Sequence, residues 1–163
     1  DTAHALLLGA CFQAKRRILA ITPYFVLDDG LRDALRLAAR RGVEVTLIIP
    51  HKSNHRLADF VRSRAMRDLA QAGVHFRMLP FMAHAKALVL DDTLALCGSI
   101  NIDLRSLLIN HEASVVFYGA ADITWVADWI TQTASSAQPY VATPPGLGRD
   151  VAEGLVQAVA FQL

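Results

Sequence analysis

The stretch from His84 to Asn101 reads His-Ala-Lys-Ala-Leu-Val-Leu-Asp-Asp-Thr-Leu-Ala-Leu-Cys-Gly-Ser-Ile-Asn. Two short apolar segments are separated here by a turn sequence, Asp91-Asp92-Thr93, and this arrangement predicts a β-hairpin. A strand that is apolar without alternation is typical of one buried on both faces. We therefore expect this hairpin inside a sheet, with its polar ends at an edge or cleft.

The open end of the predicted hairpin gathers groups that suit phosphodiester chemistry. His84 and Lys86 are two residues apart in an extended segment, so they are expected to point the same way. The returning segment brings Gly98, Ser99 and Asn101 beside them. An imidazole can attack phosphorus or transfer a proton, an ammonium neutralises phosphate, and a hydroxyl and an amide can donate hydrogen bonds to its oxygens. Glycine lets the backbone approach a ligand closely.

The spacing of these residues, H-x-K-x4-D-x6-G-S-x-N, resembles the HKD signature of the phospholipase D superfamily. The continuation from Asn101 to Glu112, N-x-D-x-R-S-x3-N-x-E, is similar to an extension found in bacterial cardiolipin synthases, and Thr22-Pro23-Tyr24-Phe25 also looks like their pattern. The resemblance covers about residues 5–135. It implies the C-terminal catalytic half of a cardiolipin synthase.

The resemblance also implies roles for individual residues. The catalytic candidates are His84, Lys86, Asp91 and Glu112; the phosphate-binding candidates are Lys86, Ser99 and Asn101; and the possible cleft-lining residues are Tyr24, Phe25 and Gly98. The turn position of Asp91 favours support of the local fold, whereas Glu112 is a candidate to orient an imidazole. We expect no cofactor and no metal site, because the six histidines are scattered without metal-binding spacing.

The mechanism of this superfamily is understood to use two facing histidines and a covalent phosphohistidine, yet the chain carries one HKD motif. The second motif is expected from an N-terminal half of the same protein or from a second copy in a homodimer. By analogy with two-motif members His84 would be the general acid, whereas in a homodimer it could be either the acid or the nucleophile.

Length and composition predict one α/β domain, because 163 residues with 53% hydrophobic and 19% charged residues suit a buried sheet between helices. We expect a three-layer α-β-α sandwich with a mixed, largely parallel central sheet, the phospholipase D-like half. Residues 1–137 form the expected HKD catalytic domain, and residues 138–163 a Pro/Gly-rich segment with a short helix near 150–161. The other expected helices span about 3–17, 28–41, 57–72 and 122–135, and the other strands 18–22, 43–49, 74–79 and 112–118.

The net charge of +1 argues against nucleic acid as the main partner. We expect anionic phospholipid, phosphatidylglycerol and cardiolipin, as substrate and product. No apolar run is long enough to span a bilayer, which predicts a soluble chain within a parent protein at the cytoplasmic membrane. Two alternatives stay open: an HKD phosphodiesterase, either a homodimeric nuclease or a phospholipase D hydrolase, and a non-catalytic module that binds lipid headgroups or a partner.

Overall fold

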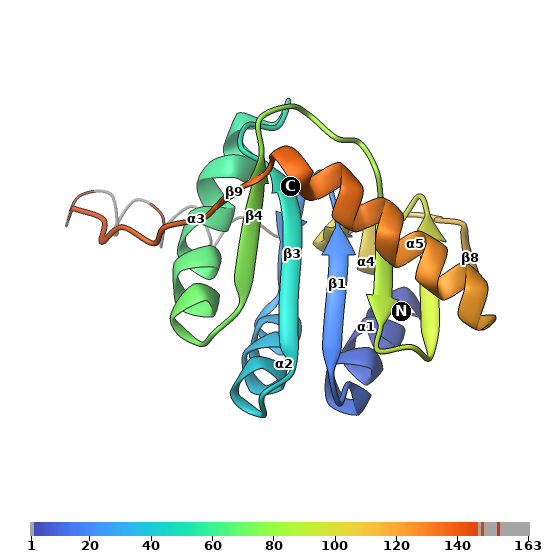
Figure 1. Ribbon diagram of the computed structural model, residues 1–163. Helices are drawn as coiled ribbons and strands as arrows, with labels where there is room; N and C mark the ends of the chain where they lie inside the picture. Colours follow the sequence, from blue (N-terminus) through green and yellow to red (C-terminus); the bar gives the residue numbers. More distant parts are fainter. Residues whose placement is uncertain (1, 147, 149–152, 154–163) are drawn as a thin grey trace.

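The computed structural model describes residues 2–146, 148 and 153, and within them a seven-stranded mixed sheet forms the middle layer (Figure 1). The order across the sheet is β8-β6-β5-β1-β3-β4-β9. The bounds are β1 (Arg17–Ile21), β3 (Glu44–Pro50), β4 (His75–Leu79), β5 (Ala87–Leu90), β6 (Leu94–Gly98), β8 (Ser114–Phe117) and β9 (Gln138–Pro139). Strands β1, β3 and β4 are parallel, whereas β5, β6 and β8 continue the sheet antiparallel and β9 pairs antiparallel with β4.

Helices cover both faces of this sheet, which confirms the predicted three-layer architecture (Figure 1). One face packs against α1 (Thr2–Gln13), α2 (Asp29–Arg40), α3 (Arg56–Gln71) and α4 (Leu104–Leu108). The opposite face packs against α5 (Ala120–Thr133), which is continued by a 3₁₀ turn (Ala134–Ser136). A separate parallel pair joins β2 (Phe25–Val26) to β7 (Ile102–Asp103).

The hairpin β5–β6 lies inside the sheet and is buried on both sides, as its apolar sequence predicts. Leu88 and Leu90 belong to the core beneath the first helical layer, whereas Ala87 and Val89 belong to the core beneath α5. All four residues of β5 are buried. The strand begins at Ala87, so the prediction that His84 and Lys86 lie within it was wrong, and both residues precede it.

Several element boundaries differ from the expected ones for reasons of tertiary structure. The first helix ends at Gln13 instead of residue 17, because the next backbone N–H groups are taken by a distant carboxylate described below. Residues 138–139 form an edge strand and not an irregular segment, and Pro139 is tolerated there because an edge strand leaves one side unpaired. The short elements β2, β7 and α4 were not predicted. The helix expected near 150–161 lies outside the described residues except for Glu153.

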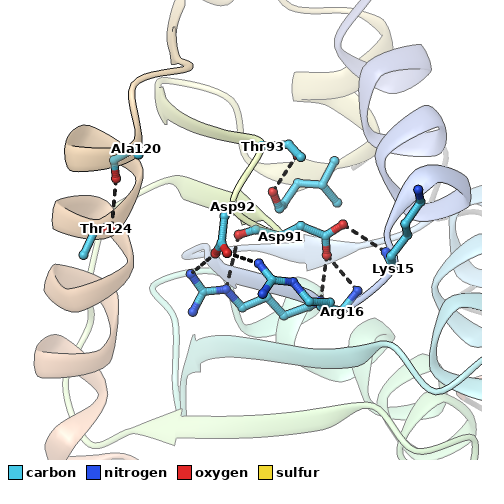
Figure 2. Close-up of polar contacts among 9 residues, drawn as sticks. Lys15, Arg16, Asp91, Asp92, Thr93, Ala120 and Thr124 are labelled. Carbon is cyan, nitrogen blue, oxygen red and sulfur yellow. Dashed lines mark hydrogen bonds and ion pairs between the residues drawn. The ribbon is translucent and has the colours of Figure 1, made fainter.

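Asp91 ties the turn of the hairpin to the start of β1 (Figure 2). Its Oδ1 accepts hydrogen bonds from the backbone N–H groups of Arg16 and Arg17, both at 2.8 Å, and its Oδ2 accepts one from Lys15 at 3.0 Å. Its own N–H donates to the carbonyl of Arg17 at 2.9 Å. With φ at +48° it occupies the left-handed region, which Asp and Asn tolerate better than most residues.

This geometry decides the role of Asp91. Asp91 lies at the opposite end of β5 from His84, so the prediction that it is a catalytic residue was wrong. Its role is structural, as its turn position indicated. Burial raises the pKa of its carboxyl group, but the three backbone N–H donors and the nearby Arg16 charge outweigh burial and hold that pKa below its ordinary value. The carboxylate is therefore ionised at neutral pH and stabilises the junction of α1 with β1.

We expect Asp91→Asn to lower the free energy of unfolding by about 1–3 kcal/mol, because one of the two acceptor oxygens becomes an N–H₂ donor facing a backbone N–H. Urea denaturation followed by circular dichroism measures the change. Asp92→Asn is the matched control: Asp92 is exposed and pairs with the Arg16 and Arg17 side chains, so its loss should cost less than about 1 kcal/mol. Equal losses in the two variants would contradict the structural role.

Stability should also depend on pH through Asp91. Its folded-state pKa lies below the unfolded value, so its contribution is complete above about pH 5 and is lost as the pH falls through the folded-state pKa. The difference in unfolding free energy between the native protein and Asp91→Asn should therefore shrink as the solution is acidified from about pH 6 towards pH 3. A difference that stays constant over this range would show that the ionised carboxylate is not what stabilises the fold.

Candidate active site

His84 and Lys86 meet at the open end of the hairpin. The Lys86 Nζ lies 3.0 Å from Nδ1 and 3.3 Å from Nε2 of the His84 imidazole, and it donates to the His84 carbonyl at 3.0 Å. The Lys86 carbonyl in turn accepts from the Gly98 N–H at 3.2 Å, which extends the ladder of β5 and β6 by one step. His84 is exposed. The pair therefore presents an accessible imidazole beside an ammonium.

Ser99 and Glu112 form the second part of the site. The Ser99 hydroxyl donates to the Glu112 carboxylate and accepts from the Ala113 N–H at 2.9 Å. The Asn110 Nδ2 donates to Glu112 Oε1 at 3.2 Å. The Ser99 hydrogen bond lowers the pKa of Glu112 most, burial raises it, and Asn110, Ser106 and Lys86 lower it further, so the net pKa is below the ordinary value. Glu112 is thus an ionised group, and a phosphate would compete with it for the Ser99 proton.

Two carboxylates support the charge of Lys86. Burial lowers the pKa of the ammonium group, and the negative charges of Glu112 and Asp103 oppose that effect without cancelling it. The contacts of His84 with Lys86, of the Lys86 carbonyl with the Gly98 N–H, and of Ser99 with Glu112 gather these residues at one end of the hairpin.

Asn101 is held by the short helix that follows it. Its Nδ2 donates to the Ser106 hydroxyl at 2.9 Å, while its buried Oδ1 has no hydrogen-bond partner within the described part of the chain. Asp103 caps α4 by accepting from the Ser106 N–H at 2.8 Å. To donate to a phosphate, the Asn101 amide must turn over, which the Ser106 hydroxyl permits because it can donate as well as accept.

The segment Thr22-Pro23-Tyr24-Phe25 positions Asn101 from the other side. The Thr22 hydroxyl donates to the Tyr24 carbonyl at 2.8 Å and accepts from the Ile102 N–H at 3.1 Å, so it joins β2 to β7. Tyr24 places its ring edge to face with His84, with 6.2 Å between the ring centroids. Phe25 is completely buried and packs against Phe76 in the core, so its prediction as a cleft-lining residue was wrong.

The structure explains why residue 98 is a glycine, which the sequence did not reveal. A Cβ atom at this position would lie 2.2 Å from the Ser114 Oγ and 2.3 Å from the Ala113 carbonyl. The backbone that approaches Gly98 so closely is therefore the entry to β8, in contrast to the predicted approach of a ligand. This close contact keeps Glu112 next to Ser99.

The loop between β3 and α3 was not predicted to belong to the site. The buried Arg62 anchors it by donating to the carbonyls of Pro50 at 2.9 Å and His51 at 3.0 Å. Further along the loop, Asn54 Oδ1 accepts from the Tyr24 hydroxyl at 2.5 Å, and the His55 ring lies 5.5 Å from the Tyr24 ring. The strand order could have indicated this loop, because β3 is parallel to β1 and the loops after both strands therefore meet at one edge of the sheet.

Two cavities flank the contact between Asn101 and Ser106. One of about 350 Å³ is lined by side chains that include Tyr24, His55 and Asp103. The other, of about 380 Å³, lies between α1 and the hairpin and has a mainly aliphatic wall. Over the described ranges of the chain, no three His, Cys, Asp or Glu side chains gather so that they could hold a metal ion.

Among the described helices, none combines the length and the apolar character that a membrane crossing requires.

The chain is similar in sequence to a described protein family and to curated relatives. The family described as "Cardiolipin synthase, PLD-like domain" matches residues 8–134. Cardiolipin synthase A of Pectobacterium carotovorum is 36% identical over 117 residues, which cover 71% of this chain and 24% of that protein. Cardiolipin synthase A of Klebsiella pneumoniae is 36% identical over 132 residues, or 78% of this chain and 27% of that protein. The chain spans about a quarter of the length of these curated relatives.

Solved structures agree with this relationship. The phospholipase D family member Nuc from Salmonella typhimurium superposes with a TM-score of 0.72 at 25% identity, covering 85% of this chain and 90% of that one. The phosphatidylserine synthase of Haemophilus influenzae shares the fold with a TM-score of 0.72 at 13% identity, covering 96% of this chain and 43% of that one. The family match extends over most of the chain and includes the whole HKD hairpin, so the protein belongs to the cardiolipin synthase family of phospholipase D-like domains.

Proposed function

We propose that this chain is one half of a phosphatidyltransferase site, which makes cardiolipin from phosphatidylglycerol through a phosphohistidine intermediate. The observation that carries the proposal is the accessible His84 imidazole beside the Lys86 ammonium, at a hairpin end that also holds Ser99, Asn101 and Glu112. The names of the cardiolipin synthase A relatives support the choice of substrate.

The second HKD motif comes from an N-terminal half of the same protein or from a second copy of this chain. Outside His84, the described histidines do not stand in an H-x-K pattern. Two half-sites that face each other across a two-fold or pseudo-two-fold axis would each contribute one imidazole. The parent protein would then act at the cytoplasmic membrane, where its anionic phospholipid substrate resides.

The chemistry runs in two displacements at phosphorus. In the first, a nitrogen of one imidazole bonds to phosphorus while the bond from phosphorus to the departing glycerol oxygen breaks, and the opposite imidazolium gives its proton to that oxygen. In the second, the acceptor hydroxyl gives its proton to the imidazole that protonated the departing oxygen, the acceptor oxygen bonds to phosphorus, and the phosphorus–nitrogen bond breaks. An imidazole with an ordinary pKa near 6.5 can serve in either role at neutral pH.

The remaining residues hold the phosphoryl group in this scheme. Lys86 neutralises the non-bridging oxygens as negative charge develops on them, and Ser99 and Asn101 donate hydrogen bonds once they exchange their present partners. The negative charge of Glu112 raises the pKa of Lys86 against the effect of burial, and its carboxylate is the group that would orient the imidazole of the opposite half.

Hydrolysis of phospholipid, the phospholipase D reaction, is the second candidate function. It is favoured by the exposure of His84, which gives water access to a phosphohistidine formed there. The same assay separates the two functions, because transfer yields cardiolipin whereas hydrolysis yields phosphatidic acid.

We expect His84→Ala to reduce the formation of both products from phosphatidylglycerol vesicles by at least about 10²-fold, because it removes the nucleophile or the general acid. The assay combines this chain with the separately expressed N-terminal half, and also tests the chain alone at concentrations that favour pairing. His75→Ala is the matched control, because His75 is exposed at the start of β4. Activity of His84→Ala equal to that of His75→Ala would contradict the proposal.

Above the pH at which the general-acid imidazolium loses its proton, the pH–rate profile should show a second alkaline limb that reports Lys86. Its ammonium must stay protonated to neutralise phosphate and its pKa is below the ordinary 10.5, so kcat/KM should fall with rising pH at a midpoint below 10.5. Glu112→Gln replaces the carboxylate by an amide of similar shape. It removes the negative charge that raises the Lys86 pKa, so the midpoint should move to lower pH. Lys86→Arg should remove this limb, because a guanidinium stays protonated. A limb that is unchanged in both variants would assign it to another group.

A further inference from the structure

We infer that the cavity of about 350 Å³ beside Asn101 binds the glycerol unit of the acceptor alcohol, so that it favours transfer to a polyol over hydrolysis. This inference rests on the proposed phosphatidyltransferase function and specifies which part of the substrate the cavity holds. We call it the polyol pocket; its lining includes Tyr24, His55, Ala58, Asn101, Asp103 and Arg105.

The polyol pocket adjoins the place where phosphorus would react. Tyr24 forms one wall, and the same ring stands edge to face with His84 at 6.2 Å between centroids. Asn101 forms another wall and is a phosphate-binding candidate. Asp103 also lines the pocket, and its negative charge raises the pKa of Lys86. An acceptor seated in the pocket would therefore have a hydroxyl next to the phosphoryl group.

The hydrogen-bonding groups of the pocket suit hydroxyls. Asn101 lines the pocket, and its amide can both donate and accept hydrogen bonds. Asp103 uses one oxygen to cap α4, and a carboxylate retains further acceptor capacity. His55 and Arg105 add exposed donors at the rim. A hydroxyl both donates and accepts, so a polyol can satisfy both kinds of group.

The walls also discriminate against other ligands. A second phosphate in the pocket would meet the negative charge of Asp103 as well as the positive charge of Arg105, so the lining has no excess of positive charge that would favour an anion. Val26, Ala58 and Leu104 provide an apolar floor that matches the carbon skeleton of a small polyol. An acyl chain has a better alternative in the aliphatic cavity of about 380 Å³ on the other side of Ser106. The pocket volume lies within the usual range for small-molecule sites, about 300–1,000 Å³.

Binding can be tested on the chain itself by nuclear magnetic resonance, without turnover. Glycerol titrated into ¹⁵N-labelled protein should shift the side-chain amide signal of Asn101 and the backbone signals of Asp103 and Arg105. Propan-1-ol at the same concentration, which keeps the carbon skeleton with a single hydroxyl, should shift them much less. Ala58→Leu fills the floor of the pocket and should suppress the shifts, whereas Ala121→Leu, at an exposed position in α5, should leave them unchanged.

The second arm measures which acceptor is used. Phosphatidylglycerol vesicles and isotopically labelled free glycerol are incubated with the chain and its N-terminal half. Cardiolipin then reports the lipid headgroup as acceptor, labelled phosphatidylglycerol reports free glycerol, and phosphatidic acid reports water. Ala58→Leu should lower the ratio of both transfer products to phosphatidic acid by about tenfold, the effect of losing about 1.4 kcal/mol of acceptor binding. Ala121→Leu should keep the ratio.

The outcomes separate this inference from the proposed function. If the wild-type pair forms neither transfer products nor phosphatidic acid, the proposed function fails, and the titration still decides whether the pocket binds a polyol. Equal shifts by glycerol and propan-1-ol, or shifts that persist in Ala58→Leu, overturn the pocket. An active Ala58→Leu variant with an unchanged transfer-to-hydrolysis ratio overturns its role in choosing the acceptor.

Discussion

The Asp91 carboxylate is the interaction on which the rest of the structure depends. It accepts hydrogen bonds from the backbone N–H groups of residues 15–17, and in this way it ends α1, starts β1 and fixes the turn of the β5–β6 hairpin. The antiparallel pairing of β5 with β1 then sets the register of the hairpin in the sheet. Because β5 is buried on both faces, a shift of one residue would exchange the side chains of its two cores. The position of His84 is therefore set from the far end of the strand by a group that does not meet the substrate.

The candidate site gathers at one edge of the sheet because of the directions of its strands. Strands β1 and β3 end at this edge, β5 begins there and β6 returns to it. The loops after β1 and β3 bring Tyr24 and Asn54 into hydrogen-bond contact. The segment from Asn101 to Glu112 continues through β7 and α4, and it carries Asp103 and Glu112, whose negative charges raise the pKa of Lys86. In the proposed phosphate site, the negative charge of Glu112, whose carboxylate accepts hydrogen bonds from Ser99 and Asn110, opposes the lowering of the Lys86 pKa by burial.

Sequence reasoning succeeded where local pattern and chemistry agree. The apolar runs of residues 87–90 and 94–97 predicted a buried hairpin, and the spacing from His84 to Asn101 predicted which polar groups converge at its end. It failed where a distant contact overrides local preference. The first helix stops early because Asp91 captures the N–H groups that would have continued it. Phe25 was predicted to line a cleft with Tyr24, yet it begins β2 and is completely buried in the core against Phe76.

The sequence by itself determined the family and the α/β layers, and it predicted the phosphate-binding candidates, because these follow from residue types at fixed spacings along the chain. The tertiary structure alone decided that Asp91 is a structural clamp, that Gly98 makes room for β8, and that His55 and Asp103 share a pocket with Asn101. Each of these depends on segments far apart in the sequence, up to 76 residues for the contact of Asp91 with Lys15. Such proximity is set by the packing of the sheet and its helices, and no local pattern encodes it.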